Sequence, residues 1–267
     1  MEGFKKYLRC YRSYFRTNML VYAEYKTDFI AINIASALIL IMGVVSLEII
    51  FAQVEHIAGW NKYQVFWMLG YFYLIRALYN TFFINTLNLG YWIRQGSLDI
   101  YITRPLGTFF QLLSTGRYNT ELPLDEYLIG LGLMIAAESH IDIIPGMAGL
   151  LYLVFALIFC TMIYTCIMFL ISAASFWIIK SNALHELVGS IERLIEYPLN
   201  IYNLTIKIIL TTILPFGFIS FYPSQYFFSF EDNKAFIVCI PVVALILILL
   251  SRLVWKKGLQ TYQSPGA

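Results

Sequence analysis

Few side chains in this sequence have the types and spacing that enzyme chemistry requires. The histidines and cysteines are scattered along the chain: His56, His140 and His185, and Cys10, Cys160, Cys166 and Cys239. They do not form pairs with the spacing of zinc ligands, and the sequence has no phosphate-binding Gly-x-x-x-x-Gly-Lys-Ser/Thr loop. We therefore expect no catalytic residues, no metal site and no nucleotide bound by this chain itself.

Two basic residues inside apolar stretches, Arg76 and Lys207, are candidates for a different kind of chemistry. A charge inside a membrane costs several kcal/mol unless it is paired or hydrated, so such residues commonly line a transport path or a subunit interface. The alternative for Arg76 is that carbonyl groups, neighbouring tyrosines or Asn80 relieve this cost without any role in transport. Lys207 has the alternative of extending its ammonium group to the inner membrane surface. Glu48 is a candidate partner of Arg76, although its expected position is nearer the outer surface.

The composition indicates the environment of these residues. The chain has 267 residues, of which 60% are hydrophobic and 13% are charged, whereas about 25% of the residues of a soluble domain are charged. Its mean hydropathy is +0.70. The first apolar stretch starts near Phe29, behind a basic segment, and continues to about Val54, which is too long for the core of a signal peptide. The sequence therefore predicts an all-α integral membrane protein.

The apolar stretches predict six transmembrane helices, because a helix needs about 20 residues to cross a bilayer. Their expected ranges are 29–54, 63–86, 122–140, 147–178, 198–217 and 235–255. The third helix is the least regular, because Asp125 and Glu126 lie near its start. Pro198 opens the fifth, and Pro215 and Pro223 then interrupt an apolar, aromatic segment whose irregular backbone must be buried in protein or re-entrant.

The sequence shows no internal repeat and no linker, so we expect a single domain over residues 1–267. Within it, we expect an interfacial segment at 1–28, the six-helix bundle at 29–255 and a cytoplasmic tail at 256–267.

The interfacial segment contains a predicted amphipathic helix over residues 4–22. Aromatic and apolar side chains recur there every three or four residues, beside a row of lysines and arginines. This pattern is typical of a helix at a membrane interface, although a helix packed on a partner protein is an alternative. A second amphipathic segment is expected at 184–195.

The distribution of lysine and arginine predicts the orientation, because cytoplasmic loops are enriched in these residues. With a cytoplasmic N-terminus, the inner segments hold fourteen of the eighteen: Lys5, Lys6, Arg9, Arg12, Arg16, Lys26, Arg94, Arg104, Arg117, Lys180, Arg193, Arg252, Lys256 and Lys257. The outer segments hold Lys62 and Lys234. We therefore expect both termini in the cytoplasm and a multi-pass protein in the plasma membrane, in contact with membrane lipids.

A polar segment, residues 91–106, interrupts the apolar chain between the second and third predicted spans. Gly96 ends one helical pattern, Ser97 and Asp99 supply local caps, and Pro105 prevents a helix from continuing through it. These residues predict one short, charged helix that faces the cytoplasm, where it is suited to docking a soluble partner. The alternative is an ordinary polar loop between two spans.

Short motifs along the chain carry a resemblance to a known family. They are Ile93-Arg94-Gln95-Gly96-Ser97-Leu98-Asp99, Arg104-Pro105-Leu106, Ser175-Phe176-Trp177, Tyr197-Pro198-x-x-Ile201-Tyr202, Leu214-Pro215 and Gly258-Leu259-x-x-Tyr262-x-Ser264-x-Gly266-Ala267. In this order, together with the six predicted spans, they resemble the permease subunits of type 2 ABC transporters, most of which are exporters. The resemblance covers most of the chain and leaves the substrate open.

The resemblance implies roles for several segments. The loop after the second span would hold a coupling helix that fits a groove on a separate ATPase subunit. The residues that this assigns to ATPase coupling are Arg94, Gln95, Gly96, Ser97, Leu98, Asp99, Arg104 and Pro105. The N-terminal helix would be a connecting helix along the inner surface, and the segment between the fifth and sixth spans would be a partly re-entrant hairpin at the outer face.

The resemblance also implies partners. Two permease halves, identical or related, would enclose the substrate path, and ATP and Mg²⁺ would bind the ABC ATPase subunits beneath them. No cofactor and no nucleic acid would bind this chain. The expected function is export of a hydrophobic or amphipathic substrate by alternating access, with drugs, peptides, lipids, polysaccharides and small toxic compounds all remaining open.

Three other classes of protein are alternatives. The first is a secondary transporter driven by an ion gradient and acting as a dimer, although such proteins usually contain two related halves, which we do not find in this sequence. The second is a membrane enzyme acting on lipid or peptide, which the scattered histidines and cysteines disfavour. The third is a membrane scaffold that transports nothing.

Overall fold

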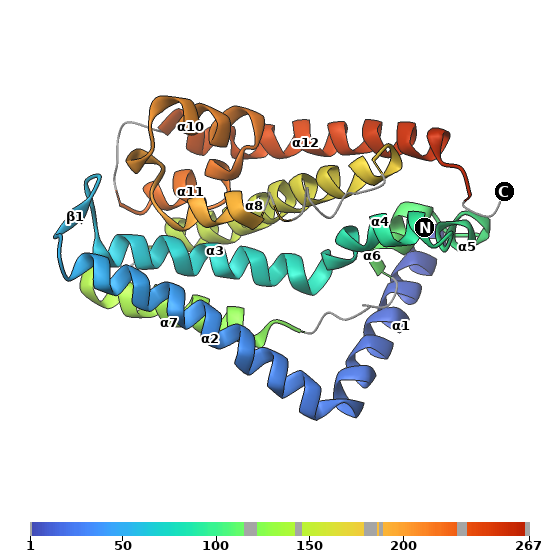
Figure 1. The fold of residues 1–267 in the computed structure, drawn as a ribbon, viewed down its shortest axis with the longest axis horizontal. Coiled ribbons are helices and arrows are strands. Elements are labelled where there is room, and N and C mark those ends of the chain that lie inside the picture. Colours follow the sequence, from blue (N-terminus) through green and yellow to red (C-terminus); the bar gives the residue numbers. More distant parts are fainter. Residues whose placement is uncertain are drawn as a thin grey trace.

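The computed structural model describes residues 2–114, 122–141, 146–178, 186, 189–228 and 234–264. The described chain is almost entirely helical and has one short antiparallel hairpin, formed by β1 (His56–Ile57) and β2 (Trp60–Asn61) (Figure 1). His56 pairs with Asn61 and Ile57 pairs with Trp60. The two turn residues, Ala58 and Gly59, both have positive φ, as the tightest hairpin turns require. We call this extremity the hairpin end.

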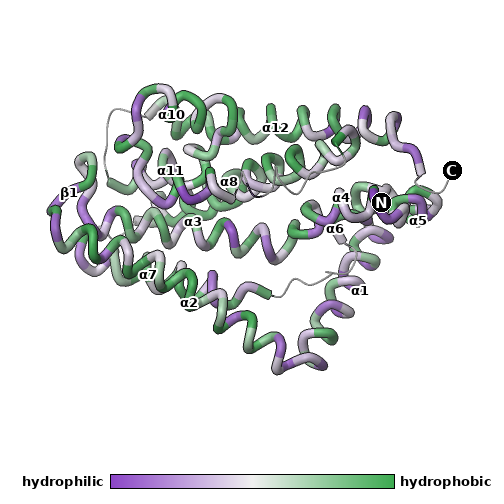
Figure 2. The backbone as a smooth tube through the Cα atoms, viewed as in Figure 1, coloured by the Kyte–Doolittle hydropathy of each residue, from purple (hydrophilic) through white to green (hydrophobic). Residues whose placement is uncertain are grey.

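Five long helices extend from the side of the hairpin end toward the opposite extremity, which α8 and α12 approach most closely (Figure 1): α2 (Lys26–Phe51), α3 (Lys62–Phe82), α7 (Leu124–Ile141), α8 (Met147–Ala173) and α12 (Lys234–Thr261). The opposite extremity, where α1 (Glu2–Glu24) begins and α12 ends, is called the terminal end. Hydrophobic residues extend along most of α2, α8 and α12, and hydrophilic residues gather at the terminal end (Figure 2).

Three helices in the described part of the chain are long and apolar enough to cross a membrane. They are α2, α8 together with the short 3-10 helix η2 (Ala174–Phe176), and α12. The prediction of an all-α membrane protein is therefore confirmed at this level. The predicted spans at 63–86 and 122–140 coincide with α3 and α7, which are 21 and 18 residues long.

The predicted fifth span, 198–217, is not one continuous helix. The segment contains η4 (Leu199–Ile201), α10 (Leu204–Ile208) and a π-helical turn, η5 (Ile209–Ile213). Pro198 does not open α10; Asn203 does, because its side chain accepts a hydrogen bond from the backbone N–H of Ile206 at 3.0 Å. As expected for the proline-interrupted segment that follows, η6 (Phe216–Phe218) and α11 (Phe221–Gln225) are short and buried among the long helices.

Two other predicted boundaries differ from the structure. Helix α12 continues to Thr261, so the first half of the expected tail at 256–267 is helical. The helix predicted over 4–22 is present as α1 and ends at Glu24, close to the expected boundary at residue 28. Of the amphipathic segment predicted at 184–195, only residues 186 and 189–195 lie in the described part, and residues 189–192 are helical there, followed by η3 (Arg193–Glu196).

Helix α3 is the centre of the fold. It begins with a reciprocal cap in which Asn61 Oδ1 accepts from the Gln64 N–H at 2.9 Å and Gln64 Oε1 accepts from the Asn61 N–H at 3.0 Å. Most of its residues from Val65 to Tyr79 are buried against α7 and α8. Gly70 and Gly130 allow α3 and α7 to touch, since a Cβ on Gly70 would lie 2.6 Å from the Gly130 carbonyl oxygen.

Candidate functional site

The chain turns sharply at Gly96, between α4 (Leu89–Arg94) and α5 (Leu98–Thr103), as the sequence predicted. Gly96 has a φ of +68°, in the left-handed region that glycine adopts without strain at a helix end. The Ser97 side chain does not cap the start of α5, contrary to our expectation, but its hydroxyl donates a hydrogen bond of 3.4 Å to the Trp92 carbonyl oxygen in α4. Arg104 is extended, as the residue before a proline usually is, so the helix ends ahead of Pro105.

The inner face of α5 is anchored on the ends of the long helices. Leu98 is fully buried, in an apolar cluster with Phe169 and Ala173 of α8 and with neighbouring side chains of α12. Tyr101 stacks on Trp92 of α4, with ring centroids 4.3 Å apart. These contacts join α5 to α4 and to two membrane-length helices, α8 and α12.

The segment that follows α5 is fastened to two other helices. Gln111 of α6 (Thr108–Ser114) donates hydrogen bonds to the carbonyl oxygens of Tyr101 and Leu106, at 2.8 and 2.9 Å. From α1, the Tyr7 hydroxyl accepts a hydrogen bond of 3.2 Å from the Gly107 N–H, and the Tyr7 ring lies edge-on to Phe110. Helix α1 is therefore part of the same structural unit as α5.

The C-terminal segment closes over α5. The Ser264 hydroxyl donates a hydrogen bond of 2.6 Å to Asp99 Oδ2. Burial and the neighbouring Asp99 carboxylate raise the pKa of Tyr262 to about 12. Asp99 is thus engaged within the chain, and its side chain is only partly available to a partner.

The opposite face of this region is exposed. Arg94, Gln95, Arg104 and Pro105 are at the surface. So are two apolar side chains that our sequence analysis did not select, Ile100 and Ile102, which are 54% and 46% exposed. Helical spacing places Ile100 on the side of α5 opposite Leu98, so periodicity was a signal for Ile100. Ile102 follows Leu98 by four positions, on the same stripe of the helix, and its exposure near the end of α5 was not predictable from spacing. We call Arg94, Gln95, Ile100, Ile102, Arg104 and Pro105 the exposed α5 surface.

A second polar site lies between the long helices. Arg76 of α3 forms an ion pair with Glu126 of α7, with Nε and Oε1 2.7 Å apart. Asn80, one turn further along α3, donates to both carboxylate oxygens of Glu126, at 3.1 and 3.0 Å. The guanidinium group also lies 5.4 Å from the centre of the Tyr73 ring. This pairing and these hydrogen bonds offset the cost of a charge between membrane helices.

The partner of Arg76 is therefore Glu126 and not Glu48. Glu48 instead pairs with Lys62 at the hairpin end, with Nζ and Oε1 2.6 Å apart. Sequence analysis missed Glu126 because it lies 50 positions from Arg76 and at the start of the least regular predicted span.

Lys207 is separate from the polar site. Its ammonium group donates a hydrogen bond of 3.1 Å to Asn200 Oδ1. Helix α10, which carries Lys207, lies toward the hairpin end (Figure 1), whereas the sequence had suggested a position nearer the inner surface. The structure therefore does not bring together the two basic residues that sequence analysis had grouped.

A cavity of about 340 Å³ adjoins the Arg76–Glu126 pair. Its lining residues come from α3, η1 (Ile84–Asn88), α7, α8 and the segment before η3: Arg76, Tyr79, Asn80, Leu87, Glu126, Tyr164, Met168, Gly189 and Glu192. The Tyr164 hydroxyl donates a hydrogen bond of 2.7 Å to Glu192 Oε1. Polar and apolar groups therefore meet in one space of the size that small organic ligands occupy.

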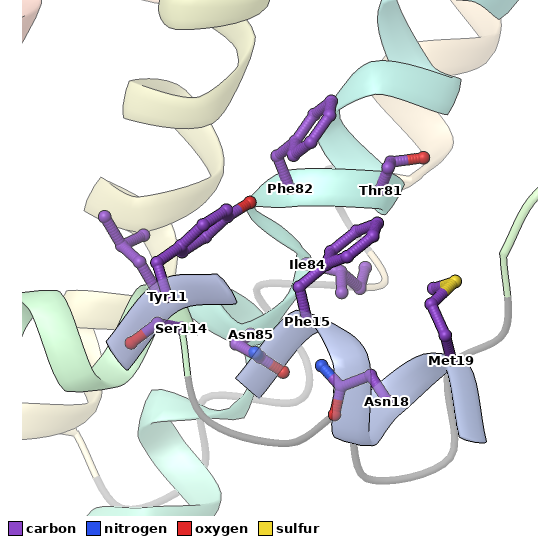
Figure 3. Close-up of a pocket in the computed structure, with 10 residues that line it drawn as sticks. Tyr11, Phe15, Asn18, Met19, Thr81, Phe82, Ile84, Asn85 and Ser114 are labelled. Carbon is purple, nitrogen blue, oxygen red and sulfur yellow. The ribbon is translucent and has the colours of Figure 1, made fainter. Parts of the chain in front are cut away.

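A smaller cavity, of about 20 Å³, lies between α1 and the C-terminal residues of α3 and α6. In Figure 3 the rings of Tyr11 and Phe15 extend from α1 toward Thr81 and Phe82, with Asn85 beside them. The apolar stripe predicted on α1 thus faces the body of the protein at this point. This volume is sufficient for about one water molecule, so the cavity marks the packing of α1 and not a ligand site.

Membrane-length apolar helices, a buried ion pair between two helices and a mixed cavity beside it are features of a membrane transport protein. The sequence matches the family model described as ABC-2 family transporter protein over residues 37–266. Because this match covers most of the chain, the protein belongs to the ABC-2 family of transporters and is a transmembrane permease component. A search of the curated proteins and a search of the solved structures gave no significant match.

Proposed function

We propose that this chain is one permease half of an ATP-driven exporter of a hydrophobic or amphipathic substrate. ATP and Mg²⁺ bind a separate ABC ATPase subunit, and this chain contributes no catalytic residue to hydrolysis. A second permease half, identical or related, completes the substrate path. ABC-2 membership supports association with an ATPase in general, and the following features of the chain support the more specific assignments.

The observation that carries the proposal is the double-sided construction of α5. Its inner side, through Leu98, is anchored on α8 and α12, while the exposed α5 surface presents two isoleucines and two arginines outward. An apolar pair flanked by cations is suited to a groove on a soluble protein. We therefore assign ATPase coupling to the segment from Arg94 to Pro105, in which Gly96, Ser97 and Asp99 maintain the shape of the helix.

The mechanism follows from this construction. ATP binding closes the two ATPase subunits, and α5 moves with the ATPase surface on which it is docked. Leu98 and the stacked pair Trp92–Tyr101 transmit this movement to α8 and α12. The permease halves then switch between inward and outward exposure. The difference in free energy between open and closed ATPase pairs provides the bias, since a ligand shifts a conformational equilibrium only by its differential affinity.

We propose a six-span, single-domain arrangement in the plasma membrane with both termini cytoplasmic. In it, α2, α3, α7, α8 and α12 are five spans, and the interrupted segment from η4 to α11 is the remaining, shortened one. The terminal end is then cytoplasmic, which agrees with the excess of lysine and arginine in the inner segments. Helix α1 lies along the inner membrane surface, in contact with lipids, as the connecting element.

The polar cavity beside Arg76 lies in the substrate path in this arrangement. Arg76 belongs to this path through its pairing with Glu126, which holds α3 and α7 together at the cavity wall. Helix α10 lies toward the hairpin end (Figure 1), and its Lys207 is proposed to face the second permease half and not the cavity.

Purification of the tagged chain from its native membrane in a mild detergent tests the proposal, with each co-purifying subunit identified by mass. We expect a stoichiometric soluble protein with a phosphate-binding loop, and a second permease if the pair is heteromeric. Replacement of Ile100 and Ile102 by Asp should abolish this association. Replacement of the exposed Leu38 and Met42, on α2, by Ala is a matched control, because these apolar side chains lie far along the chain from α5.

A chain that purifies alone or only with itself, in several mild detergents, would contradict the proposal. Transport that continues after ATP depletion and stops when the proton gradient collapses would then identify a gradient-driven dimer.

A further inference from the structure

The charges that line the 340 Å³ cavity do not balance. Arg76 is bound to Glu126, so this arginine and this carboxylate neutralise one another. Glu192 contributes a second carboxylate to the lining, and it has no ion-pair partner within the described residues. Its hydrogen bond comes from a neutral donor, the Tyr164 hydroxyl. The cavity therefore carries one carboxylate more than its cations neutralise.

A nearby third carboxylate increases this imbalance. Glu196 follows Glu192 by one helical turn, in η3, and is itself only partly exposed. Arg193, the nearest cation in sequence, is exposed, its guanidinium group contacts Ser190 at 3.5 Å, and it forms no ion pair with Glu196 among the described residues, so it offsets this charge only in part. Partly buried carboxylates without an ion-pair partner favour a bound positive charge over an empty site.

The remaining lining groups define what else the ligand presents. Tyr79 and Tyr164 are buried aromatic residues at the cavity, and aromatic faces attract organic cations. Leu87 and Met168 contribute apolar surface, and the unbranched side chain of methionine adapts to ligands of different shape. Asn80 is occupied by Glu126, so the cavity has few free groups that would recognise a sugar or a peptide backbone.

We propose that this cavity is the substrate site and that it takes an amphipathic organic cation. One positively charged group lies against Glu192, and an aromatic or apolar body lies against Tyr79, Tyr164 and Met168. Glu192 is the specificity-determining residue, and Tyr164 positions its carboxylate through the hydrogen bond of 2.7 Å. The Arg76–Glu126 pair is structural in this site, since its two charges neutralise one another. This inference rests on the proposed transport function, for which it names the substrate class.

Two probes of equal shape and opposite charge test the inference, tetraphenylphosphonium and tetraphenylborate. Their binding to the complex purified from its native membrane is measured by equilibrium dialysis, with detergent micelles alone as the blank. We expect tetraphenylphosphonium to bind and tetraphenylborate not to compete with it. Glu192→Gln should weaken binding of the cation about tenfold, because it removes one charge from direct contact. Tyr164→Phe should weaken it less.

Glu186→Gln is the matched control, because Glu186 is an exposed glutamate six positions before Glu192 and outside the cavity lining. This variant should bind the cation as the original protein does. Equal binding of both probes to the original complex, or equal affinity of the Glu192→Gln and Glu186→Gln variants for the cation, would overturn the inference. Because the first comparison uses no variant at the site, misfolding of Glu192→Gln would not prevent a decision.

The same preparation separates this inference from the proposed function. A complex that contains an ATPase and hydrolyses ATP, yet does not distinguish the two probes, leaves the exporter proposal intact and refutes the cation site. A chain without an ATPase refutes the exporter proposal. Selective binding of tetraphenylphosphonium to that isolated chain would still support the cavity as a cation site.

Discussion

The Ser264 hydroxyl donates a hydrogen bond of 2.6 Å to Asp99, across a separation of 165 positions in the sequence. It joins the C-terminal segment to the second residue of α5. Because this segment continues directly from α12, the helix is connected to α5 twice, once through this hydrogen bond and once through the apolar cluster around Leu98. The hydrogen bond connects the segment after α12 to Asp99, which lies beside the exposed α5 surface.

Ser264→Ala should loosen this connection. The substitution removes the donor to a carboxylate, and hydrogen bonds to charged groups contribute about 1.5–3 kcal/mol when buried; partial exposure places this one at the lower limit. We expect faster proteolysis of the C-terminal segment and a smaller stimulation of ATP hydrolysis by transported substrate. Gln263→Ala, at the exposed neighbouring position, is the control. Identical proteolysis of the two variants would show that the contact does not fasten the segment.

Substitutions on the two sides of α5 should have different consequences. Leu98→Ala removes a fully buried side chain, and such truncations cost about 2–5 kcal/mol. We expect a lower midpoint of thermal unfolding for Leu98→Ala. Ile100→Ala should leave this midpoint unchanged, because its side chain is exposed, but should weaken binding of the ATPase subunit. Pull-down of the ATPase and a thermal melt on the same preparations check both. An equal decrease in the midpoint of thermal unfolding for both variants would contradict the assignment of Leu98 to the buried side and Ile100 to the exposed side of α5.

Local signals in the sequence predicted much of the fold. Gly96 and Pro105 delimit α5 because a left-handed residue and a missing N–H act within a few positions. The apolar stretches predicted α2, α8 and α12 because each contains a long window that is nearly free of charge. The predicted fifth span failed for a related reason. The average hydropathy of residues 198–217 records their apolar character. Asn203 and Pro215 break the helix in that segment, but two residues change the average only a little.

The candidate site was less predictable, because its contacts connect distant parts of the chain. Arg76 was recognisable as a charge in an apolar stretch, but no local pattern joins it to Glu126 or to Glu192. The inward orientation of Leu98 likewise depends on Phe169, which is brought to it by the packing of α8.

The close approach of α3 and α7 predicts a difference between two glycines of similar sequence context. Gly70→Ala would place a Cβ 2.6 Å from the Gly130 carbonyl oxygen, so the helices must separate. We expect destabilisation of about 1–3 kcal/mol, the usual effect of overpacking. Gly132→Ala has open space around its Cβ and should be neutral or stabilising by up to about 1 kcal/mol, because alanine favours helix. Thermal unfolding in detergent checks the pair, and equal midpoints would show that α3 and α7 do not touch there.

The buried and exposed ion pairs should respond differently to loss of the cation. Arg76→Ala leaves Glu126 buried without its partner, which typically costs about 3–5 kcal/mol. Lys62→Ala breaks a pair at the surface, where such pairs contribute at most about 1 kcal/mol. The midpoint of thermal unfolding should therefore be clearly lower for Arg76→Ala than for Lys62→Ala.

The double variant Arg76→Leu/Glu126→Leu should recover most of the stability lost in Arg76→Ala, because no unpaired charge remains. It should not recover transport if this pair shapes the cavity wall. Full recovery of transport in the double variant would reduce the role of the pair to neutralisation of charge between α3 and α7.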